Sequence, residues 1–570
     1  MLRGIGTSKG IGMGQALVIV DQNVQVKTET VKDAEQEVKR FRDARQHFID
    51  ETQILIEDLS KQLGEQEKTA LVLKNQVYLV KDVELNEGIE NLIRTQKICS
   101  EAAVEDTCNL YINIFSNMEN TTMNQRVIDI VDMKNRLIRI LMGVGEVDYK
   151  DIKPGTVIIA RELHPSMTAL MDTSCIAGIV AEKGGYISHA AILARALEIP
   201  AVLNVKDVCG KIKNNQQVIV DGETGEVYVN PAEEMIESYK VKQEAFRKKK
   251  EELKKYIDKD TKTADGKKVL LAANIGNVQE AAKAVTDGAE GIGLFRTEFL
   301  FMNGVSMPTQ EEQFEAYRKA AVIFNGKPVI IRTLDIGGDK DIPYMGLSRE
   351  VNPFLGFRGI RFCLDREDVF TVQLRAILRA SAYGNIRIMI PMVTTLQEIR
   401  SVKKIIKNIQ QELDSSKIAY DKNIKLGIMI ETPAAAAMAD VLAREVDFFS
   451  IGTNDLTQYM MAVDRGNENV AYLSSAFNPA VLRMIERVIR CGHEAGIEVG
   501  MCGEVAGNPM MIPLLLAFGL DEFSVTASKV LDIRKNISEW TCSEAAEVAK
   551  RAMELYTDKE VEEYLHNYIY

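Results

Sequence analysis

Arginines and carboxylates follow short apolar segments at several points in the C-terminal half of the sequence. Arg296 follows GIGLF, Arg332 follows PVII, Glu431 follows KLGIMI and Asp455 follows FFSIGTN. Guanidinium groups bind carboxylates and phosphates through two parallel hydrogen bonds. Two carboxylates combined with substrate oxygens suit Mg2+. The set therefore predicts a site for a small phosphorylated carboxylic acid, with Mg2+ on Glu431 and Asp455.

Further polar residues extend this set. Arg358 lies in NPFLGFRGIRF, Arg465 lies in VDRGN, and Asn454 directly precedes Asp455. Several arginines at one site are unfavourable unless other charges balance them. We therefore expect a bound anion or metal to balance these charges.

Cys502 follows the apolar segment EVGM, next to the same predicted site. A single cysteine is more often a packed thiol, but its place near the arginines makes proton chemistry an equal alternative. The residues alone leave both open.

His189 stands out among the five histidines, in GGYISHAAILARALEIP. Ser188 is a good N-cap, and the residues that follow it favour a helix. A helix N-terminus disfavours the imidazolium and favours an anion, and a neutral imidazole can act as a nucleophile. His189 is therefore either a phosphate-accepting nucleophile or a histidine that only hydrogen-bonds locally.

The elements that must position these residues form two patterns. Beyond Asp265, eight apolar segments alternate with helical ones, which predicts a (β/α)8 barrel with its polar residues at the carboxyl ends of the strands. The segments are VLLAAN, GIGLF, PVIIRT, IRIMIPMV, KLGIMIE, FFSIGT, EVGMCG and EFSVTA. The fourth ends in apolar residues, so we expect little chemistry from it.

The N-terminal half begins with a predicted strand at 11–20, continues with a helical stretch from about Thr30 to Val144, and returns to strands up to about Asn230. This order predicts an α/β domain (1–22 and 145–231) with an inserted helical subdomain (23–144). A charged helical linker (232–260) and the barrel domain (261–570) follow. Glu244 and Lys248 form an i,i+4 pair, which is typical of a solvated helix.

The composition excludes some classes of protein. The chain has 70 Lys and Arg against 82 Asp and Glu, a net charge of −12, which argues against a nucleic-acid partner. The eight cysteines are scattered, as expected for reduced thiols in the cytoplasm. The apolar N-terminal stretch is too short and glycine-rich to span a membrane, so we expect no membrane insertion.

Together these motifs resemble enzyme I of the phosphoenolpyruvate:sugar phosphotransferase system, over essentially the whole chain. The resemblance rests on GIGTSKGIGMGQAL, GGYISHAAILARALEIPAV, DGAEGIGLFRTEFLF, VIIRTLDIGGDK, NPFLGFRGIRF, GIMIETPAA, FFSIGTNDLTQY and GMCGEVAG. It implies transfer of the phosphoryl group of phosphoenolpyruvate (PEP) to a histidine and then to an HPr-like phosphocarrier, with release of pyruvate. It also implies a homodimer through the barrel.

The resemblance assigns roles to individual positions. His189 becomes the phosphorylated residue and Cys502 the general acid that protonates the enolate. The implied PEP contacts are Arg296, Arg332, Arg358, Asn454 and Arg465, and the implied Mg2+ ligands are Glu431 and Asp455.

The sequence departs from the family pattern at two places. Tyr186, Ile187 and Ala190 replace the arginine and hydroxyl residues usual around the histidine, and Leu73-Lys74-Asn75-Gln76 replaces a usual F-E-A-H in the helical part. A regulatory PEP-binding paralogue with a different acceptor is therefore an alternative. A PEP synthase or pyruvate phosphate dikinase would need an ATP-binding module, for which the sequence has no phosphate-binding glycine loop.

Overall fold

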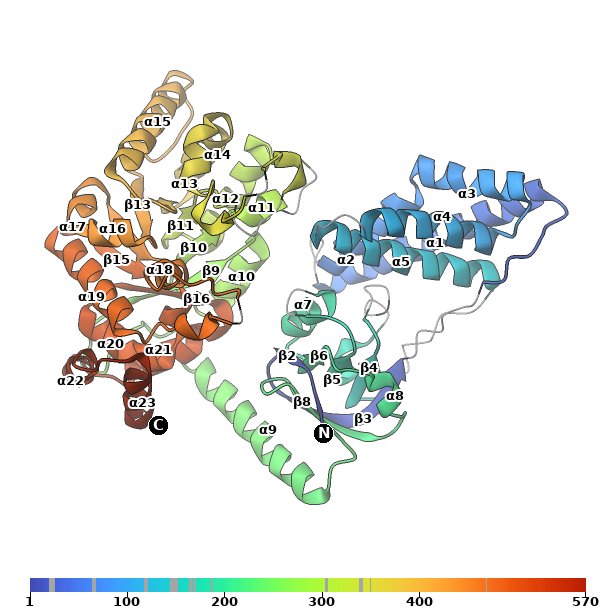
Figure 1. Ribbon diagram of the computed structural model, residues 1–570, viewed down its shortest axis with the longest axis horizontal. Helices are drawn as coiled ribbons and strands as arrows, with labels where there is room; N and C mark the ends of the chain where they lie inside the picture. The colour runs from blue at the N-terminus through green and yellow to red at the C-terminus, as the bar shows by residue number, and fades with distance from the viewer. Residues whose placement is uncertain are drawn as a thin grey trace. The chain divides into compact units, whose positions relative to one another are not determined.

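The computed structural model of the protein (Figure 1) describes residues 1–19, 26–63, 68–116, 121–143, 152–163, 167, 171–185, 188–302, 306–337, 342–348, 350–467 and 469–569. The chain divides into two units, residues 1–249 and 250–570, and each is described by itself.

Five helices occupy the stretch that the sequence predicts as helical. They are α1 (Ala34–Leu63), α2 (Lys68–Val80), α3 (Val83–Gln96), α4 (Ser100–Ser116) and α5 (Thr121–Met142). Their apolar faces share one core, in which Phe41, Phe48 and Val104 are fully or almost fully buried. Asp82 begins α3 as an N-cap, because its side chain accepts a hydrogen bond from the amide of Leu85.

A mixed sheet forms the rest of the first unit, in the strand order β1-β8-β7-β3-β4-β5-β6-β2. The strands are β1 (Leu2–Arg3), β2 (Ile5–Ser8), β3 (Ile11–Ile19), β4 (Thr156–Ala160), β5 (Ile176–Ala181), β6 (Ala201–Leu203), β7 (Gln217–Asp221) and β8 (Glu226–Val229). β3 pairs in parallel with β4, with Leu17 opposite Ile158. Because α1–α5 lie between these two neighbouring strands in the sequence, they are an insertion into the α/β fold.

Helices α7 (His189–Ala196) and α8 (Val208–Lys211) connect strands of this sheet, and α9 (Glu233–Lys254) follows it. Along α9, Glu244 lies 2.9 Å from Arg247 and 3.9 Å from Lys248. The predicted solvated helix is therefore present, with the predicted Glu244–Lys248 pair.

The second unit is a closed barrel of eight parallel strands, in the order β10-β11-β12-β13-β14-β15-β16-β9. The strands are β9 (Leu270–Ile275), β10 (Ile292–Arg296), β11 (Val329–Arg332), β12 (Ile386–Ile390), β13 (Lys425–Ile430), β14 (Phe448–Ile451), β15 (Glu498–Met501) and β16 (Glu522–Thr526). Each corresponds to one of the eight apolar segments predicted as strands.

Helices cover the outside of this barrel (Figure 1). They are α10 (Val278–Thr286), α11 (Glu298–Met302), α12 (Gln310–Phe324), α13 (Ile360–Asp365), α14 (Glu367–Ala380), α15 (Leu396–Ser415), α16 (Pro433–Ala437), α17 (Ala439–Leu442), α18 (Thr453–Met460), α19 (Pro479–Glu494), α20 (Ile512–Phe518), α21 (Val530–Ser538), α22 (Cys542–Met553) and α23 (Asp558–Ile569). Two hydrophobic layers result: an extensive core between strands and helices, and a small cluster that includes Leu294, Met389, Met429, Phe448 and Cys502.

The predicted fold class is confirmed: an α/β domain with inserted helices, followed by a (β/α)8 barrel. The predicted domain boundaries remain predictions. Within the described part of the chain, no helix combines the length and the apolar character needed to cross a bilayer.

Candidate active site

The polar residues predicted from the sequence gather at the carboxyl end of the barrel because all eight strands run in the same direction. Arg296 and Arg332 are the last residues of β10 and β11 and are register partners. Glu431 directly follows β13, Asn454 and Asp455 lie in the first turn of α18 after β14, and Cys502 directly follows β15.

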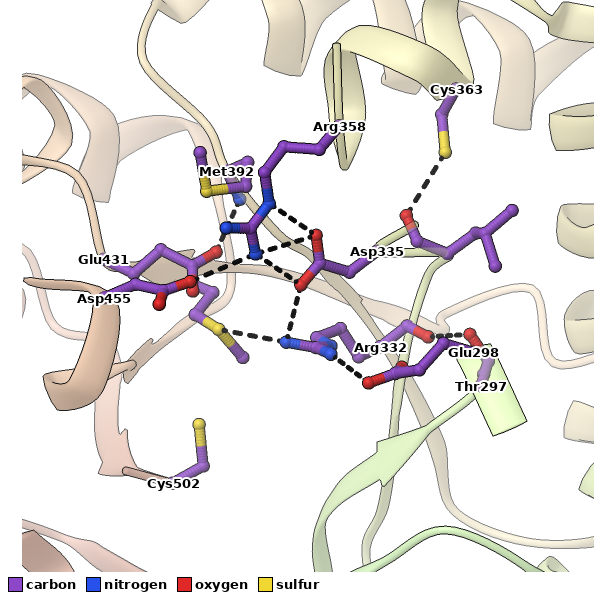
Figure 2. Close-up of polar contacts among 12 residues, drawn as sticks. Thr297, Glu298, Arg332, Asp335, Arg358, Cys363, Met392, Glu431, Asp455 and Cys502 are labelled. Carbon is purple, nitrogen blue, oxygen red and sulfur yellow. Dashed lines mark hydrogen bonds and ion pairs between the residues drawn. The ribbon is translucent and has the colours of Figure 1, made fainter. Parts of the chain in front are cut away.

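A chain of alternating charges crosses this end of the barrel (Figure 2). Arg332 Nη2 lies 2.7 Å from Glu298 Oε1, and Arg332 Nη1 lies 3.2 Å from Asp335 Oδ2. Arg358 Nη2 continues the chain, at 2.9 Å from Asp335 Oδ2 and 3.1 Å from Asp455 Oδ2. All five residues are buried, so these pairs are held in a low-dielectric environment.

The chain of charges keeps both arginines ionised. Burial by itself lowers the pKa of Arg332, but the neighbouring carboxylates, foremost Glu298, outweigh it and raise that pKa. The same balance, with Asp335 as the main carboxylate, raises the pKa of Arg358. Both guanidinium groups are therefore permanent cations at this end of the barrel.

The expectation that only a ligand or metal balances the arginines is wrong for Arg332 and Arg358. Glu298, Asp335 and Asp455 balance them within the chain. Spacing along the sequence could not reveal this, because the partners come from different strand ends. Glu298 and Asp335 each stand two or three residues beyond a strand-end arginine, which is the only sequence signal for them.

Arg296 and Arg465 are less constrained. The guanidinium of Arg296 lies 5.0 Å from the ring centroid of Phe299, and its buried Nε has no hydrogen-bond partner. Arg465 is 43% exposed and its Nη2 lies 3.5 Å from Asp455 Oδ1. Donors of this kind remain available to an incoming anion. The Asn454 side chain accepts a hydrogen bond from the amide of Glu504.

Glu431 is the most perturbed carboxyl group of the site. Burial raises its pKa to about 8, and the carboxylates of Asp455 and Asp335 add to this effect. Its Oε1 accepts a hydrogen bond of 2.6 Å from the amide of Met392, a residue with φ of 58°. A backbone amide beyond β12 therefore orients this carboxyl group, while the expectation of little chemistry from the apolar end of the fourth strand stays a prediction.

The carboxylates fit a divalent cation. Glu431 carries repulsion from Asp455 and Asp335 that a nearby cation would relieve, and oxygen ligands are those that Mg2+ prefers. A Cβ atom at Gly452 would come within 3.0 Å of Glu431 Oε2, so the glycine leaves space beside this oxygen. Among the described residues there is no cluster of three or more His, Cys, Asp or Glu side chains that could hold a metal by themselves.

Cys502 is 6% exposed and belongs to the small hydrophobic cluster with Met389 and Met429. Burial raises the pKa of its thiol to about 12. The thiol therefore stays protonated at neutral pH, as a proton donor must. Figure 2 shows Cys502 on the same side of the barrel as Arg332 and Glu431.

His189 is the first residue of α7, in the other unit of the chain. Ser188 is the N-cap, as predicted: its Oγ accepts a hydrogen bond from the amide of Ala191 at 3.3 Å and donates one to the carbonyl of Gly185 at 2.8 Å. Ala190 and Ala191 are buried and pack against the sheet. Tyr186 and Ile187 lie outside the described residues.

Family comparisons cover almost the whole chain. Residues 3–126 match the family "PEP-utilising enzyme, N-terminal", residues 152–225 match "PEP-utilising enzyme, mobile domain", and residues 250–542 match "PEP-utilising enzyme, PEP-binding domain".

Individual relatives agree with this assignment. Phosphoenolpyruvate-protein phosphotransferases from Bacillus sp. (strain S) and Geobacillus stearothermophilus are each 44% identical over 98% of this chain and 96% of their own. The protein of the same name from Staphylococcus carnosus is 42% identical over 100% of this chain and 99% of its own. The chain therefore belongs to the phosphoenolpyruvate-protein phosphotransferase family, the enzyme I family predicted from its motifs.

Proposed function

We propose that this protein transfers the phosphoryl group of PEP to Nε2 of His189 and then to an HPr-like phosphocarrier, and that it releases pyruvate. One observation carries the proposal. Four arginines meet Glu431, Asp455 and two further carboxylates at the carboxyl end of one barrel, in a chain that also begins a helix at His189. The arginines and carboxylates suit an anion that binds together with a cation, and His189 suits the role of phosphoryl acceptor.

PEP has a carboxylate and a phosphate, and the arginines provide for both. Arg332 and Arg358 are buried cations already oriented by carboxylates, so they need little reorganisation when the substrate binds. Arg296 and Arg465 have freer guanidinium groups that complete the contacts, and the backbone around Asn454 adds to them. Such positioning and charge neutralisation are the main contributions to phosphoryl transfer.

Glu431 and Asp455 would hold Mg2+, which supplies charge neutralisation at the phosphate oxygens. The Glu431 carboxyl must lose its proton for this role, because the cation binds the ionised form. Asp455 would keep Arg358 and Arg465 next to the cation site.

The reaction balances with the residues of this chain. The neutral imidazole of His189 attacks phosphorus, the bond from phosphorus to the enol oxygen breaks, and the enolate leaves. The Cys502 thiol gives its proton to the methylene carbon of the enolate, which yields pyruvate and a thiolate. The thiolate regains a proton from water. The N-terminus of α7 favours the anionic phosphoryl group on its first residue.

His189 and the arginines lie in different units of the chain, so the reaction requires the two units to meet. The phosphorylated histidine must afterwards reach the carrier.

We propose the inserted helices α1–α5 as the carrier-docking part. Of the residues that depart from the family pattern in α2, Leu73 and Gln76 are buried, whereas Lys74 is half-buried and Asn75 is exposed, so the departures alter both the interior and the surface of the bundle. We also propose a homodimer through the barrel, in the cytoplasm, where its eight free cysteines stay reduced.

Labelled PEP tests the proposal. Incubation of the protein with 32P-PEP and Mg2+ should give acid-labile phosphate and one pyruvate per site. His189→Ala should take up none, whereas His47→Ala, a matched change at an exposed histidine paired with Glu51, should label normally. Absence of label in a folded protein, or label in His189→Ala, would contradict the proposal.

A panel of HPr-like carriers then tests the second transfer. Label should pass from the protein to a carrier histidine. Binding of PEP without any label on His189 would instead support the alternative, a regulatory PEP-binding paralogue.

A further inference from the structure

A cavity of about 560 Å3 opens at the amino ends of the barrel strands, opposite to the end where Arg296 and Arg332 lie. It is lined by residues at or next to the starts of several strands, among them Leu270, Arg387, Phe448, Glu498 and Glu522. These residues stand at the amino ends of β9, β12, β14, β15 and β16. The cavity is therefore a second site on the barrel, and it shares no lining residue with the predicted PEP site.

Apolar residues form part of the cavity wall. Val269, Leu270, Pro328, Ile330 and Phe449 contribute to it. The volume and the apolar lining are typical of sites that hold small organic molecules.

Most charged groups around the cavity have partners in the chain. Asp260 lies 2.7 Å from Lys268, and Glu498 lies 2.6 Å from Arg387. Asp521 accepts a hydrogen bond from the amide of Val499 and lies 2.9 Å from His493 Nε2. Glu290 accepts hydrogen bonds from two backbone amides.

Two groups around the cavity have a buried atom without a hydrogen-bond partner. One is Arg387, whose Nη1 pairs with Glu498 but whose Nε has none, and the other is Glu522. Glu522 is 7% exposed, and the unpartnered atom is its Oε1. The carboxyl group occupies space that two glycines leave in the barrel interior: a Cβ at Gly293 would come within 2.4 Å of Oε1, and one at Gly500 within 3.3 Å. An unpartnered carboxyl group in such a place is costly, which indicates that a donor from outside the chain completes it.

The charge of the lining selects the ligand. Five carboxyl groups line the cavity, with only Lys268 and Arg387 as cations. A ligand carboxylate would meet Glu498, Asp521 and Asp260 at the rim, whereas an ammonium group would be attracted.

We propose that this cavity binds a small organic cation, with a primary ammonium group held by Glu522 and an aliphatic body against Ile330, Phe448 and Phe449. This inference is independent of the proposed phosphotransfer. The cavity shares no lining residue with the proposed PEP contacts, so its ligand would be a second, non-substrate ligand of the enzyme.

Calorimetric titration of the full-length protein with 1,5-diaminopentane tests this site. Its neutral analogue 1,5-pentanediol has the same body without the charges. We expect the diamine to bind at one site with an affinity at least tenfold above that of the diol. Glu522→Gln keeps the shape of the side chain and should weaken diamine binding at least tenfold. The matched control is Glu431→Gln, at the opposite end of the barrel, which should bind the diamine as the native protein does.

The native protein alone gives a second test, which is useful if Glu522→Gln fails to fold. Burial raises the pKa of Glu522 to about 7, Arg387 opposes this, and Glu498 and Asp521 add to it. An ammonium group binds the ionised carboxyl group, so affinity should rise about tenfold between pH 6 and pH 8.

Three results would overturn the proposal. The first is no diamine binding at millimolar concentration, which would mean that water alone completes Glu522. The second is equal binding of diamine and diol, or of the diamine to Glu522→Gln and the native protein. The third is an affinity that does not change between pH 6 and pH 8.

Discussion

The guanidinium group of Arg358 and the carboxylate of Asp335 form a buried pair that uses both carboxylate oxygens. Arg358 Nη2 lies 2.9 Å from Oδ2 and 3.1 Å from Oδ1, and Nε lies 3.2 Å from Oδ1. Since Asp335 Oδ2 also lies 3.2 Å from Arg332 Nη1, one carboxylate fixes two arginines. Arg358 also pairs with Asp455. The arginines expected to bind the anion and the carboxylate expected to bind the cation are therefore in direct contact.

Asp335→Asn should therefore reduce catalysis without unfolding the barrel. Arg332 would keep Glu298 and Arg358 would keep Asp455, but neither guanidinium group would be fixed for the substrate. A misplacement of this kind costs on the order of 100-fold in rate. We expect kcat/KM for PEP to fall by about that factor, with a higher KM, in a steady-state assay of pyruvate release. Asp368→Asn, which removes an exposed pair with Arg366, should have no effect. Equal kinetics for the two variants would show that Asp335 does not position the arginines.

Glu431 should make cation binding depend on pH. Its pKa of about 8 means that the carboxyl group is mostly protonated below pH 8, and Mg2+ must compete with that proton. Mg2+ binding should therefore strengthen as pH rises, by about tenfold between pH 6 and pH 7. Mn2+ titration followed by electron paramagnetic resonance measures this without turnover. In Glu431→Gln the residual binding should be weaker and should lose this dependence. A native affinity that is constant from pH 6 to pH 8 would contradict the assignment of Glu431 as a ligand.

The sequence predicted the strands of the barrel because each one is buried on both faces and reads as an apolar run between turns. It also placed the start of α7, since Ser188 is a strong N-cap before a run of helix formers. Both signals are local in the sequence. The short strands β1, β2 and β8 were not predicted individually.

The partners of the arginines escaped for a different reason. Glu298 is far from its partner Arg332 in the sequence, and Asp335 is far from its partner Arg358. Asp335 follows its other partner, Arg332, by only three residues, in a loop. The Met392 amide left no signal at all, because a backbone N–H exists at almost every position. What positions it is a positive φ, a conformation that Met residues rarely adopt.

Ser188 should stabilise the beginning of α7. Ser188→Ala removes the acceptor for the Ala191 amide, and loss of such a cap costs about 1 kcal/mol. Native-state hydrogen exchange should therefore show about fivefold faster opening of the α7 amides. Ser188→Asn keeps an acceptor and should retain most of the protection, and Ser538→Ala, at the end of α21, should leave α7 unchanged. Unaltered protection in Ser188→Ala would mean that packing of Ala190 and Ala191 alone holds the helix.

Substitution of Cys502 can distinguish a role of its thiol as proton donor from a role in packing. With a pKa of about 12, its thiol remains protonated throughout the pH range of an assay, so its donor state should show no titration between pH 6 and pH 9. Cys502→Ser preserves the size of the side chain but replaces the thiol by a much weaker acid. Loss of a positioned proton donor costs on the order of 100- to 10,000-fold. Pyruvate release should therefore slow by that range, while PEP affinity stays within about twofold.

The matched control for Cys502 is Cys491→Ser, in the buried face of α19. Both substitutions place a hydroxyl in an apolar setting and carry a similar cost in stability, but only Cys502 lies at the carboxyl end of a barrel strand. If Cys502→Ser lowers thermal stability as Cys491→Ser does and leaves pyruvate release unchanged, the thiol serves the small hydrophobic cluster with Met389 and Met429 and another group must protonate the enolate. If pyruvate release falls only in Cys502→Ser, packing cannot explain the loss, because the control experiences the same change of polarity without it.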